Sequence, residues 1–122
     1  MKKIAIIIAS HQGLAQALTI HRELPETELF YAGEGQENPC TSIDSIPAFV
    51  AANFTRYEGL VFIGALGICV RAIAPCIHSK YTDPAVVNID STGKHVISVL
   101  SGHVGGANEL TRRLASILGA HP

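Results

Sequence analysis

The sequence lacks long apolar runs and carries few charged residues. Of its 122 residues, 48% are hydrophobic and only 16% are charged, a balance that excludes an intrinsically disordered chain. No apolar run approaches the roughly 18 to 20 residues that a membrane-spanning helix needs. A chain of this length has room for one hydrophobic core. We therefore expect a soluble protein that forms a single domain over residues 1–122 and has no membrane partner.

Basic residues are also scarce. Nine Lys plus Arg stand against ten Asp plus Glu, which gives a net charge of -1. Proteins that bind nucleic acid gather lysines and arginines to neutralise phosphates, and the sequence has no such cluster. We therefore expect no nucleic-acid partner.

The cysteines are too few, and odd in number, for a disulfide framework. There are three, Cys40, Cys69 and Cys76. The apolar stretch that follows Met1-Lys2-Lys3 runs only from Ile4 to Ala9, so it indicates a buried strand rather than a secretory signal. These features favour a cytoplasmic location, where thiols stay reduced.

Apolar runs rich in β-branched residues alternate with segments of helical apolar spacing, a pattern typical of an α/β domain. Serines, prolines and a glycine mark the helix ends, with Ser10 and Ser45 as expected N-caps. The expected strands are residues 4–9, 28–32, 59–63, 85–89 and 95–100. The expected helices are residues 11–23, a segment carrying Ile43 to Phe54, one that begins at Ile68 and kinks or stops near Pro75, and one that begins at Glu109 and is capped by Gly119.

The last two expected strands are joined by a turn at residues 90–93, which is short enough to make them antiparallel neighbours. The predicted fold is therefore α/β, a three-layer α/β/α sandwich with a five-stranded, mostly parallel but mixed sheet. A helix in such a sheet normally returns to a strand, and no strand pattern follows Gly119. We therefore expect the chain to be a fragment of a longer protein.

Two segments place glycines between a strand and a helix: Gly64 to Gly67, and Ser101 to Asn108. Unpaired N–H groups and the positive end of the helix dipole meet at such a junction and attract carboxylates or phosphates. The alternative is that these glycines serve only tight turns and close packing. The second segment has more polar residues than a turn requires. We expect both helix N-termini to face one shared cleft.

Four side chains in or near these segments are candidates for chemistry. His103 lies within the second segment and can act as a general acid or base, although a loop histidine often has no role. Arg71 follows the first segment in an apolar stretch, and its planar guanidinium suits a carboxylate, although a solvated arginine is the alternative. Lys80 and Asp83 are weaker candidates, since charges in a loop are often only solvated.

Other site types have little support. Neither glycine segment has the G-x-G-x-x-G or P-loop spacing of a nucleotide site, and there is no G-x-S-x-G nucleophile motif. A metal site at Cys69, Cys76 and His78 is an alternative, but the two thiols share a helix face with Ile73 and are more simply core residues. We expect no metal ligand set and no covalent catalysis.

The chain closely resembles the N-terminal domain of the cobalt-precorrin-5A hydrolase family, CbiG, over essentially its whole length. The resemblance rests on the stretch from Gly64 to Pro75, on Lys80 and Asp83 to Val87, and above all on SGHVGGANEL at residues 101–110. It implies a hydrolase of the anaerobic branch of cobalamin biosynthesis. Such an enzyme opens the δ-lactone of a cobalt-corrinoid, releases acetaldehyde and leaves cobalt-precorrin-5B. In that family the polypeptide continues into a middle segment and a C-terminal domain.

From this resemblance and the residues above, we expect His103 to be catalytic. The expected substrate-binding residues are Gly64, Gly67, Arg71, Lys80, Ser101, Gly102, Gly105, Gly106 and Asn108. The substrate brings its own cobalt, so we expect no resident cofactor. A second reading is a non-catalytic tetrapyrrole- or anion-binding domain that contacts a catalytic C-terminal domain of its own protein, and a third is a nucleotide-binding α/β domain.

Overall fold

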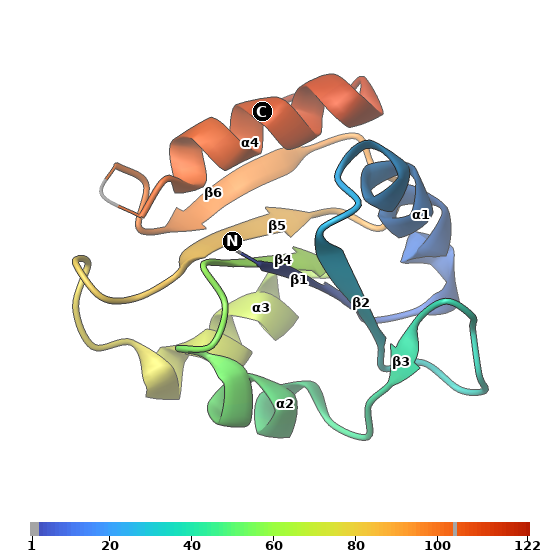
Figure 1. The fold of residues 1–122 in the computed structure, drawn as a ribbon, viewed down its shortest axis with the longest axis horizontal. Coiled ribbons are helices and arrows are strands. Elements are labelled where there is room, and N and C mark those ends of the chain that lie inside the picture. The colour runs from blue at the N-terminus through green and yellow to red at the C-terminus, as the bar shows by residue number, and fades with distance from the viewer. Residues whose placement is uncertain (1–2, 104) are drawn as a thin grey trace.

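A computed structural model describes residues 3–103 and 105–122 and contains one mixed sheet with helices on both faces (Figure 1). The strand order is β3-β2-β1-β4-β5-β6. The strands are β1 (Ile4–Ile8), β2 (Thr27–Tyr31), β3 (Thr41–Ser42), β4 (Gly59–Ile63), β5 (Ala85–Ile89) and β6 (Val96–Leu100). The helices are α1 (Leu14–Glu23), α2 (Ile46–Asn53), α3 (Leu66–Ile73) and α4 (Ala107–Leu118). Short 3-10 turns, η1 (His11–Gly13) and η2 (Ala74–Cys76), precede α1 and follow α3.

The centre of the sheet is parallel and buried on both faces. β1 pairs with β2 on one side and with β4 on the other, with Ile4 opposite Gly59. Every residue of β4 and β5 is buried. Strands without a polar face pack in this way when helices cover both sides of a sheet. The apolar runs in the sequence therefore predicted these strands.

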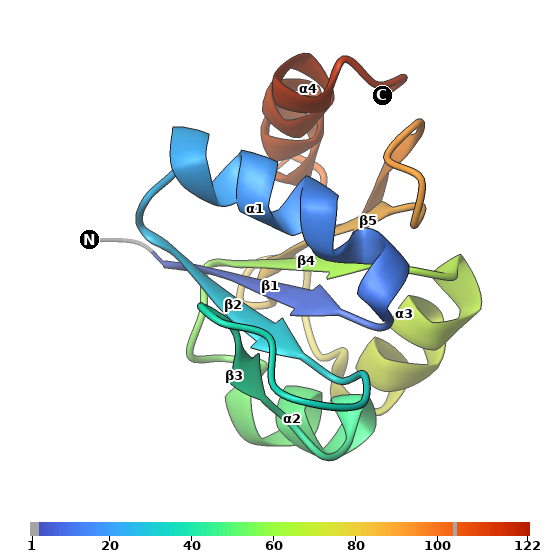
Figure 2. The same cartoon turned by 90° about the vertical axis from the view of Figure 1, so that its right-hand side faces the viewer.

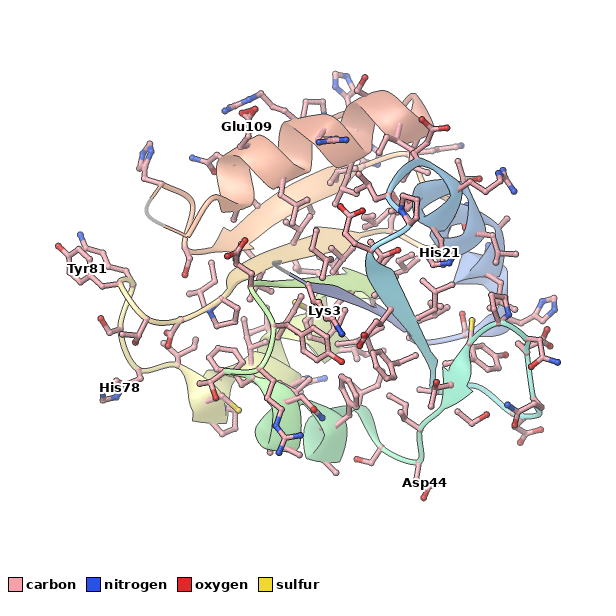
Figure 3. The ribbon with its side chains drawn as sticks, viewed as in Figure 1. Lys3, His21, Asp44, His78, Tyr81 and Glu109 are labelled. Carbon is pink, nitrogen blue, oxygen red and sulfur yellow. The ribbon has the colours of Figure 1, made fainter. Side chains whose placement is uncertain are left out.

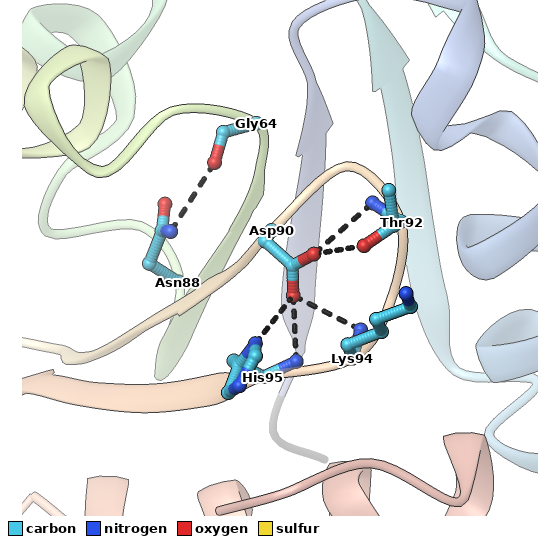
Figure 4. A network of polar contacts seen from close by, with 6 residues as sticks. All are labelled: Gly64, Asn88, Asp90, Thr92, Lys94 and His95. Carbon is cyan, nitrogen blue, oxygen red and sulfur yellow. Dashed lines mark hydrogen bonds and ion pairs between the residues drawn. The ribbon is translucent and has the colours of Figure 1, made fainter.

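The sheet becomes mixed at β6, as predicted. β6 runs antiparallel to β5, with Ile89 opposite Val96 and Val86 opposite Leu100, and the register shifts between Val86 and Val87. The Asp90 carboxylate holds the connecting turn by accepting hydrogen bonds from the backbone N–H groups of Lys94 at 3.0 Å and His95 at 2.6 Å (Figure 4). This reversal decides at which edge of the sheet the next loop lies.

Helices α1 and α4 cover one face of the sheet, and α2 and α3 cover the other (Figure 2). The sheet has one hydrophobic core on each face, and successive residues of β1 point into alternate cores. Ile6 and Ile8 pack against α1 and α4, while Ala5 and Ile7 pack against α2 and α3. The period of two along a strand accounts for this division. The predicted three-layer α/β/α architecture is confirmed.

Helix ends follow the predicted capping residues with one difference. Ser45 accepts a hydrogen bond from the N–H of Ala48 at 3.2 Å, and Gly119 ends α4 at a φ of 66°. Pro75 coincides with the change from α3 to η2. Ser10 flanks the turn before α1, but its side chain makes no capping hydrogen bond.

Besides shifts of one to three residues at other strand and helix ends, the structure differs from the expectation in its strand number, in the starts of two helices and in the C-terminal residues. The described chain has six strands rather than five, because two residues of the expected loop, Thr41 and Ser42, pair with the end of β2. α3 and α4 begin two residues earlier than expected, at Leu66 and Ala107. After α4, His121 returns to the sheet and forms a parallel bridge with His95 at the outer edge of β6. None of the described helices is long and apolar enough to span a membrane.

Candidate functional site

The two glycine segments lie at opposite edges of the sheet (Figure 1). We call the edge where the parallel strands begin the amino edge, and the edge where they end the carboxyl edge. Gly64 follows the end of β4 and so lies at the carboxyl edge. Ser101 follows β6, whose last residue pairs with the start of β5, so it lies at the amino edge. The expectation of one shared cleft is therefore wrong, because the antiparallel direction of β6 separates the two segments by the length of a strand.

At the carboxyl edge, the turn after β4 requires a glycine at position 64. Its φ is 152°, and a Cβ atom there would lie 2.8 Å from the side chain of Ala9. The Gly64 carbonyl accepts a hydrogen bond at 3.3 Å from the side-chain amide of Asn88, a buried residue of β5 (Figure 4). The first glycine of this segment thus serves a tight turn and close packing.

Gly67 and Arg71 share the outer face of α3. A Cβ atom at Gly67 would lie 3.9 Å from a guanidinium nitrogen of Arg71, so the arginine folds back toward the start of the helix. Arg71 is exposed, and within the described part of the chain it has no hydrogen bond or ion pair. The guanidinium is therefore free to meet an anion from outside the domain.

The amino-edge loop, residues 101–106, is built around a residue in a strained conformation. Ser101 is buried and has a φ of 61°, which is uncommon for a residue other than glycine. Its hydroxyl donates to the carbonyl of Asp83 at 3.3 Å, and its own carbonyl accepts from the N–H of Ala107 at 3.0 Å. Gly105 is pressed against Ser101, since a Cβ atom at Gly105 would lie 2.4 Å from the Ser101 Cβ.

Gly102 and Asn108 close the same loop. The Gly102 carbonyl accepts from the N–H of Asn108 at 3.0 Å, and the Asn108 side-chain oxygen accepts from the Ser98 hydroxyl at 2.8 Å. A Cβ atom at Gly102 would lie 2.9 Å from that oxygen. Ser101, Gly102 and Asn108 therefore shape the loop through their own contacts with each other and with β6.

Two glycines of this loop have backbone N–H groups that are unpaired among the described residues, and both line a cavity. Within the described residues, the N–H groups of Gly105 and Gly106 have no hydrogen-bond partner. Both glycines line a cavity of about 600 Å³ and a smaller neighbouring cavity of about 280 Å³. His103 is exposed on the same loop, and Val104 lies outside the described residues. Gly105 and Gly106 thus lie at the cavity, whereas His103 shares their loop but is not among the residues that line either cavity.

Lys80 belongs to this edge as well. It lies in the connection from η2 to β5, where its ammonium sits 5.4 Å from the ring centroid of Tyr81 (labelled in Figure 3), a residue of the cavity wall. Asp83 holds this connection by accepting hydrogen bonds from the N–H groups of His78 at 2.9 Å and Ser79 at 3.2 Å. Of the predicted site residues, those of the second segment and Lys80 lie together, whereas Gly64, Gly67 and Arg71 do not join them.

Sequence reasoning missed a polar group on the opposite wall of the cavity. Tyr57 donates to one oxygen of the Glu28 carboxylate at 2.6 Å, and Lys3 donates to the other at 3.0 Å. Lys3 and Tyr57 line the cavity. These residues come from three separate segments, so no sequence spacing signals them.

This polar group shifts two pKa values in opposite directions. The hydrogen bond from Tyr57, then the one from Lys3, lowers the pKa of Glu28 despite its partial burial. Burial, followed by the neighbouring carboxylate, raises the pKa of Tyr57 to about 12. Tyr57 is therefore a neutral hydrogen-bond donor at physiological pH.

Cys69 and Cys76 lie in or against the hydrophobic core beneath α2 and α3. Cys69 is fully buried on the inner side of α3, and burial raises the pKa of its thiol to about 12. Cys76 is half-buried and packs against the same core. The prediction that these thiols are core residues is confirmed for Cys69, and a buried protonated thiol of this kind is unreactive.

Comparisons with known proteins identify the family. A family model described as "Cobalamin synthesis G N-terminal" matches residues 48–122. The chain is 47% identical to cobalt-precorrin-5A hydrolase of Salmonella typhimurium over 99% of this chain and 34% of the relative. It is 41% identical to cobalt-precorrin-5A hydrolase of Priestia megaterium over 97% of this chain and 33% of the relative.

A solved structure agrees with the fold. The crystal structure of a cobalamin biosynthesis protein G homolog from Sulfolobus solfataricus matches 98% of this chain with a TM-score of 0.75 and 30% sequence identity, and the match covers 35% of that chain. The chain thus spans about a third of the length of the relatives that it matches. From the match over residues 48–122 and these relatives, we conclude that the chain belongs to the cobalamin synthesis G N-terminal family.

Proposed function

We propose that the protein containing this domain is a cobalt-precorrin-5A hydrolase of anaerobic cobalamin biosynthesis. It opens the δ-lactone of the corrinoid substrate and releases acetaldehyde to give cobalt-precorrin-5B. The observation that carries the proposal is the 47% identity, over nearly the whole of this chain, to the Salmonella typhimurium enzyme of that name. The cobalt belongs to the substrate, so the proposal includes no resident cofactor. The expected cytoplasmic location stays a prediction.

The amino-edge cavity is the reaction site in this proposal. A cavity of about 600 Å³ admits the lactone-bearing rim of a corrinoid while the rest of the macrocycle lies outside it. The substrate carries acetate and propionate groups, and Lys3, Arg56 and Lys80 place cations on or beside the cavity. Gly64, Gly67 and Arg71 have no part in the reaction site in this proposal, because Gly64 lies at the opposite edge and none of the three lines the cavity.

Lactone opening needs a base and a place for negative charge. His103 accepts a proton from water, whose oxygen attacks the lactone carbonyl carbon. The developing oxyanion accepts hydrogen bonds from the N–H groups of Gly105 and Gly106, which have no partner in the described structure. The acyl carbon–oxygen bond then breaks, and the ring oxygen leaves with the proton that His103 returns to it. The products are a carboxyl group and a free hydroxyl.

Acetaldehyde release follows from that hydroxyl. It loses its proton, its oxygen forms a carbonyl, and the bond between its carbon and the macrocycle breaks. The conjugated macrocycle takes the electron pair and is then protonated. One water is consumed overall, and no oxidant or reductant is needed. The domain supplies only proton transfer and hydrogen bonds for both steps.

Turnover by the complete protein tests the proposal. We expect His103→Ala to lower turnover of cobalt-precorrin-5A, measured as acetaldehyde release, by on the order of 10² to 10⁴ while substrate binding is nearly unchanged. His103→Gln should be equally poor, because an amide does not transfer the proton. His11→Ala is the matched control, since His11 is an exposed histidine away from the cavity.

A second candidate function is substrate binding without catalysis. It is favoured by the length of the relatives, because two thirds of each relative lies outside the match. In that case this domain only binds the tetrapyrrole or its anionic groups, and the base lies elsewhere. Wild-type turnover in His103→Ala, with substrate binding intact, would establish this second function and exclude His103 as the base.

A further inference from the structure

Helix α3 exposes an unusual number of large apolar side chains. Leu66, Ile68 and Val70 are exposed by 41%, 41% and 45%, although the helix has only eight residues. Its opposite side buries Cys69, Ala72 and Ile73 in the core that α3 shares with α2. A helix that is apolar on nearly every side is typical of one covered on every side. We call Leu66, Ile68, Val70 and Arg71 the α3 surface.

Arg71 lies in the middle of this surface. Gly67 and Arg71, four positions apart, share the outermost line of the helix, with Leu66 and Val70 on one side of that line and Ile68 on the other. The guanidinium lies over Gly67 and has no partner among the described residues. An unpaired arginine flanked by apolar side chains is a combination enriched in protein interfaces.

The exposed apolar area extends to the neighbouring strand. Ile97 of β6 is 41% exposed. It lies opposite Asn88 and next to Val96, which packs under α4, so Ile97 projects from the face of the sheet that carries α3. The α3 face therefore presents apolar side chains from two elements.

The lengths of the relatives indicate what covers this face. Both cobalt-precorrin-5A hydrolases and the Sulfolobus solfataricus homolog are about three times as long as this chain. An apolar surface of this kind on a domain that is a third of such a protein marks an interface with the remainder. None of the residues of the α3 surface lines the reaction cavity, so the cavity makes no use of this surface.

We propose that the α3 surface is where the rest of the family polypeptide docks, with a carboxylate of that part bound by Arg71 between apolar contacts to Leu66, Ile68 and Val70. A carboxylate suits the planar, two-pronged guanidinium, and the apolar rim excludes water from the pair. The interface explains why Arg71 has no partner among the described residues of this domain. It rests on family membership and holds for the hydrolase and for the binding function alike.

Cysteine labelling in the complete protein tests the proposal. Ile68→Cys is alkylated with a maleimide in the full-length protein and in the 122-residue domain, which buries a hydrophobic cluster on each face of its sheet. Peptide mass spectrometry separates the thiol introduced at position 68 from the native thiols. We expect the introduced thiol to react at least tenfold more slowly in the full-length protein. Arg112→Cys, on the exposed side of α4, compares reagent access in the two forms.

A charge reversal adds a second measurement. In the full-length protein carrying Ile68→Cys, Arg71→Glu should restore fast labelling, because it repels the partner carboxylate, whereas Arg71→Lys should restore it only in part. Equal labelling at position 68 in the full-length protein and the domain overturns the proposal. Protection that depends on protein concentration overturns it in favour of a second copy, and protection that needs added corrinoid overturns it in favour of substrate. Labelling requires no turnover, so loss of the proposed hydrolase activity leaves this result unaffected.

Discussion

At the amino edge, the hydrogen bond between Tyr57 and Glu28 joins two side chains whose pKa values are both shifted. The pKa of Tyr57 is raised to about 12 by burial and by the Glu28 carboxylate. A raised folded-state pKa means that this contribution to stability is complete below the unfolded value, near ~10, and is lost as the pH rises through the folded value. The pKa of Glu28 is lowered by its hydrogen bonds to Tyr57 and Lys3, so its contribution is lost as the pH falls through the folded value.

We predict that an ultraviolet titration of the tyrosines contains one ionisation near 12 that disappears in Tyr57→Phe. Glu28→Gln should move this ionisation to lower pH, because the amide carries no negative charge next to the phenol. The burial of Tyr57 remains in that variant, so its pKa should not return fully to the ordinary value. An unchanged titration in Tyr57→Phe would contradict the assignment.

Glycine is required at positions 105 and 106 of the amino-edge loop for two different reasons. Gly106 has a φ of 86° and open space around it, while Gly105 has an ordinary φ but is packed against Ser101. We predict that Gly106→Ala costs about 1 to 2 kcal/mol of stability through its backbone conformation. Gly105→Ala should cost more, because its methyl group displaces Ser101 and with it the hydrogen bond to Asp83. Urea unfolding of the two variants measures the difference, and an equal loss would refute this account of the loop.

At the scale of elements, the two predicted serine caps offer a matched comparison. Ser45 accepts a hydrogen bond from the N–H of Ala48, whereas the Ser10 side chain caps nothing among the described residues. We predict that Ser45→Ala lowers the free energy of unfolding by about 1 kcal/mol and that Ser10→Ala leaves it nearly unchanged. Thermal or urea unfolding of both variants checks this. A larger effect at Ser10 than at Ser45 would show that the capping geometry is not what stabilises the helix starts.

Elements with a strong local signal were predicted from the sequence, and those set by distant pairing were not. The apolar runs of β1, β4 and β5 have no polar face, so their continuous apolar composition was enough to predict buried strands. The two-residue β3 has no such signal, because it exists only through pairing with the end of β2. The helix starts were misplaced by two residues because neither Ala65 nor Gly106 caps its helix with a side chain.

The candidate site shows the same division. His103 and the glycines around it stand next to each other in the sequence, so a motif located that loop. Lys3 and Tyr57 reach the cavity from segments more than 50 residues apart, and only the folded chain brings them together. The antiparallel pairing of β6 with β5 places the two glycine segments at opposite edges of the sheet. This pairing was itself predicted, but the expectation of one shared cleft did not take its consequence into account.

For the whole molecule, the separation of the two glycine segments has an energetic consequence. β5 is five residues long, which places Gly64 and Ser101 roughly 13 Å or more apart along the sheet. Arg71, on α3, is not among the residues that line the amino-edge cavity. We predict that Arg71→Ala and His103→Ala act independently on kcat/KM in the full-length protein, with the loss in the double variant equal to the product of the single losses within ~0.5 kcal/mol. A double-mutant cycle measures this, and a coupling above about 1 kcal/mol would mean that the two residues share one site.

The position of β1 in the sheet also bears on how the domain folds during synthesis. β1 leaves the ribosome before the other strands of this sheet, yet it is a central strand, and its pairing with β4 joins Ile4 to Gly59, 55 positions further along the chain. Until β4 emerges, β1 has only β2 beside it, and the apolar side chains of Ala5 and Ile7 lack α3, one of the two helices that later cover them. Closing such a long loop before its contacts form is slow. The nascent domain therefore presents an unpaired apolar strand edge, which is a surface that chaperones or other nascent chains bind.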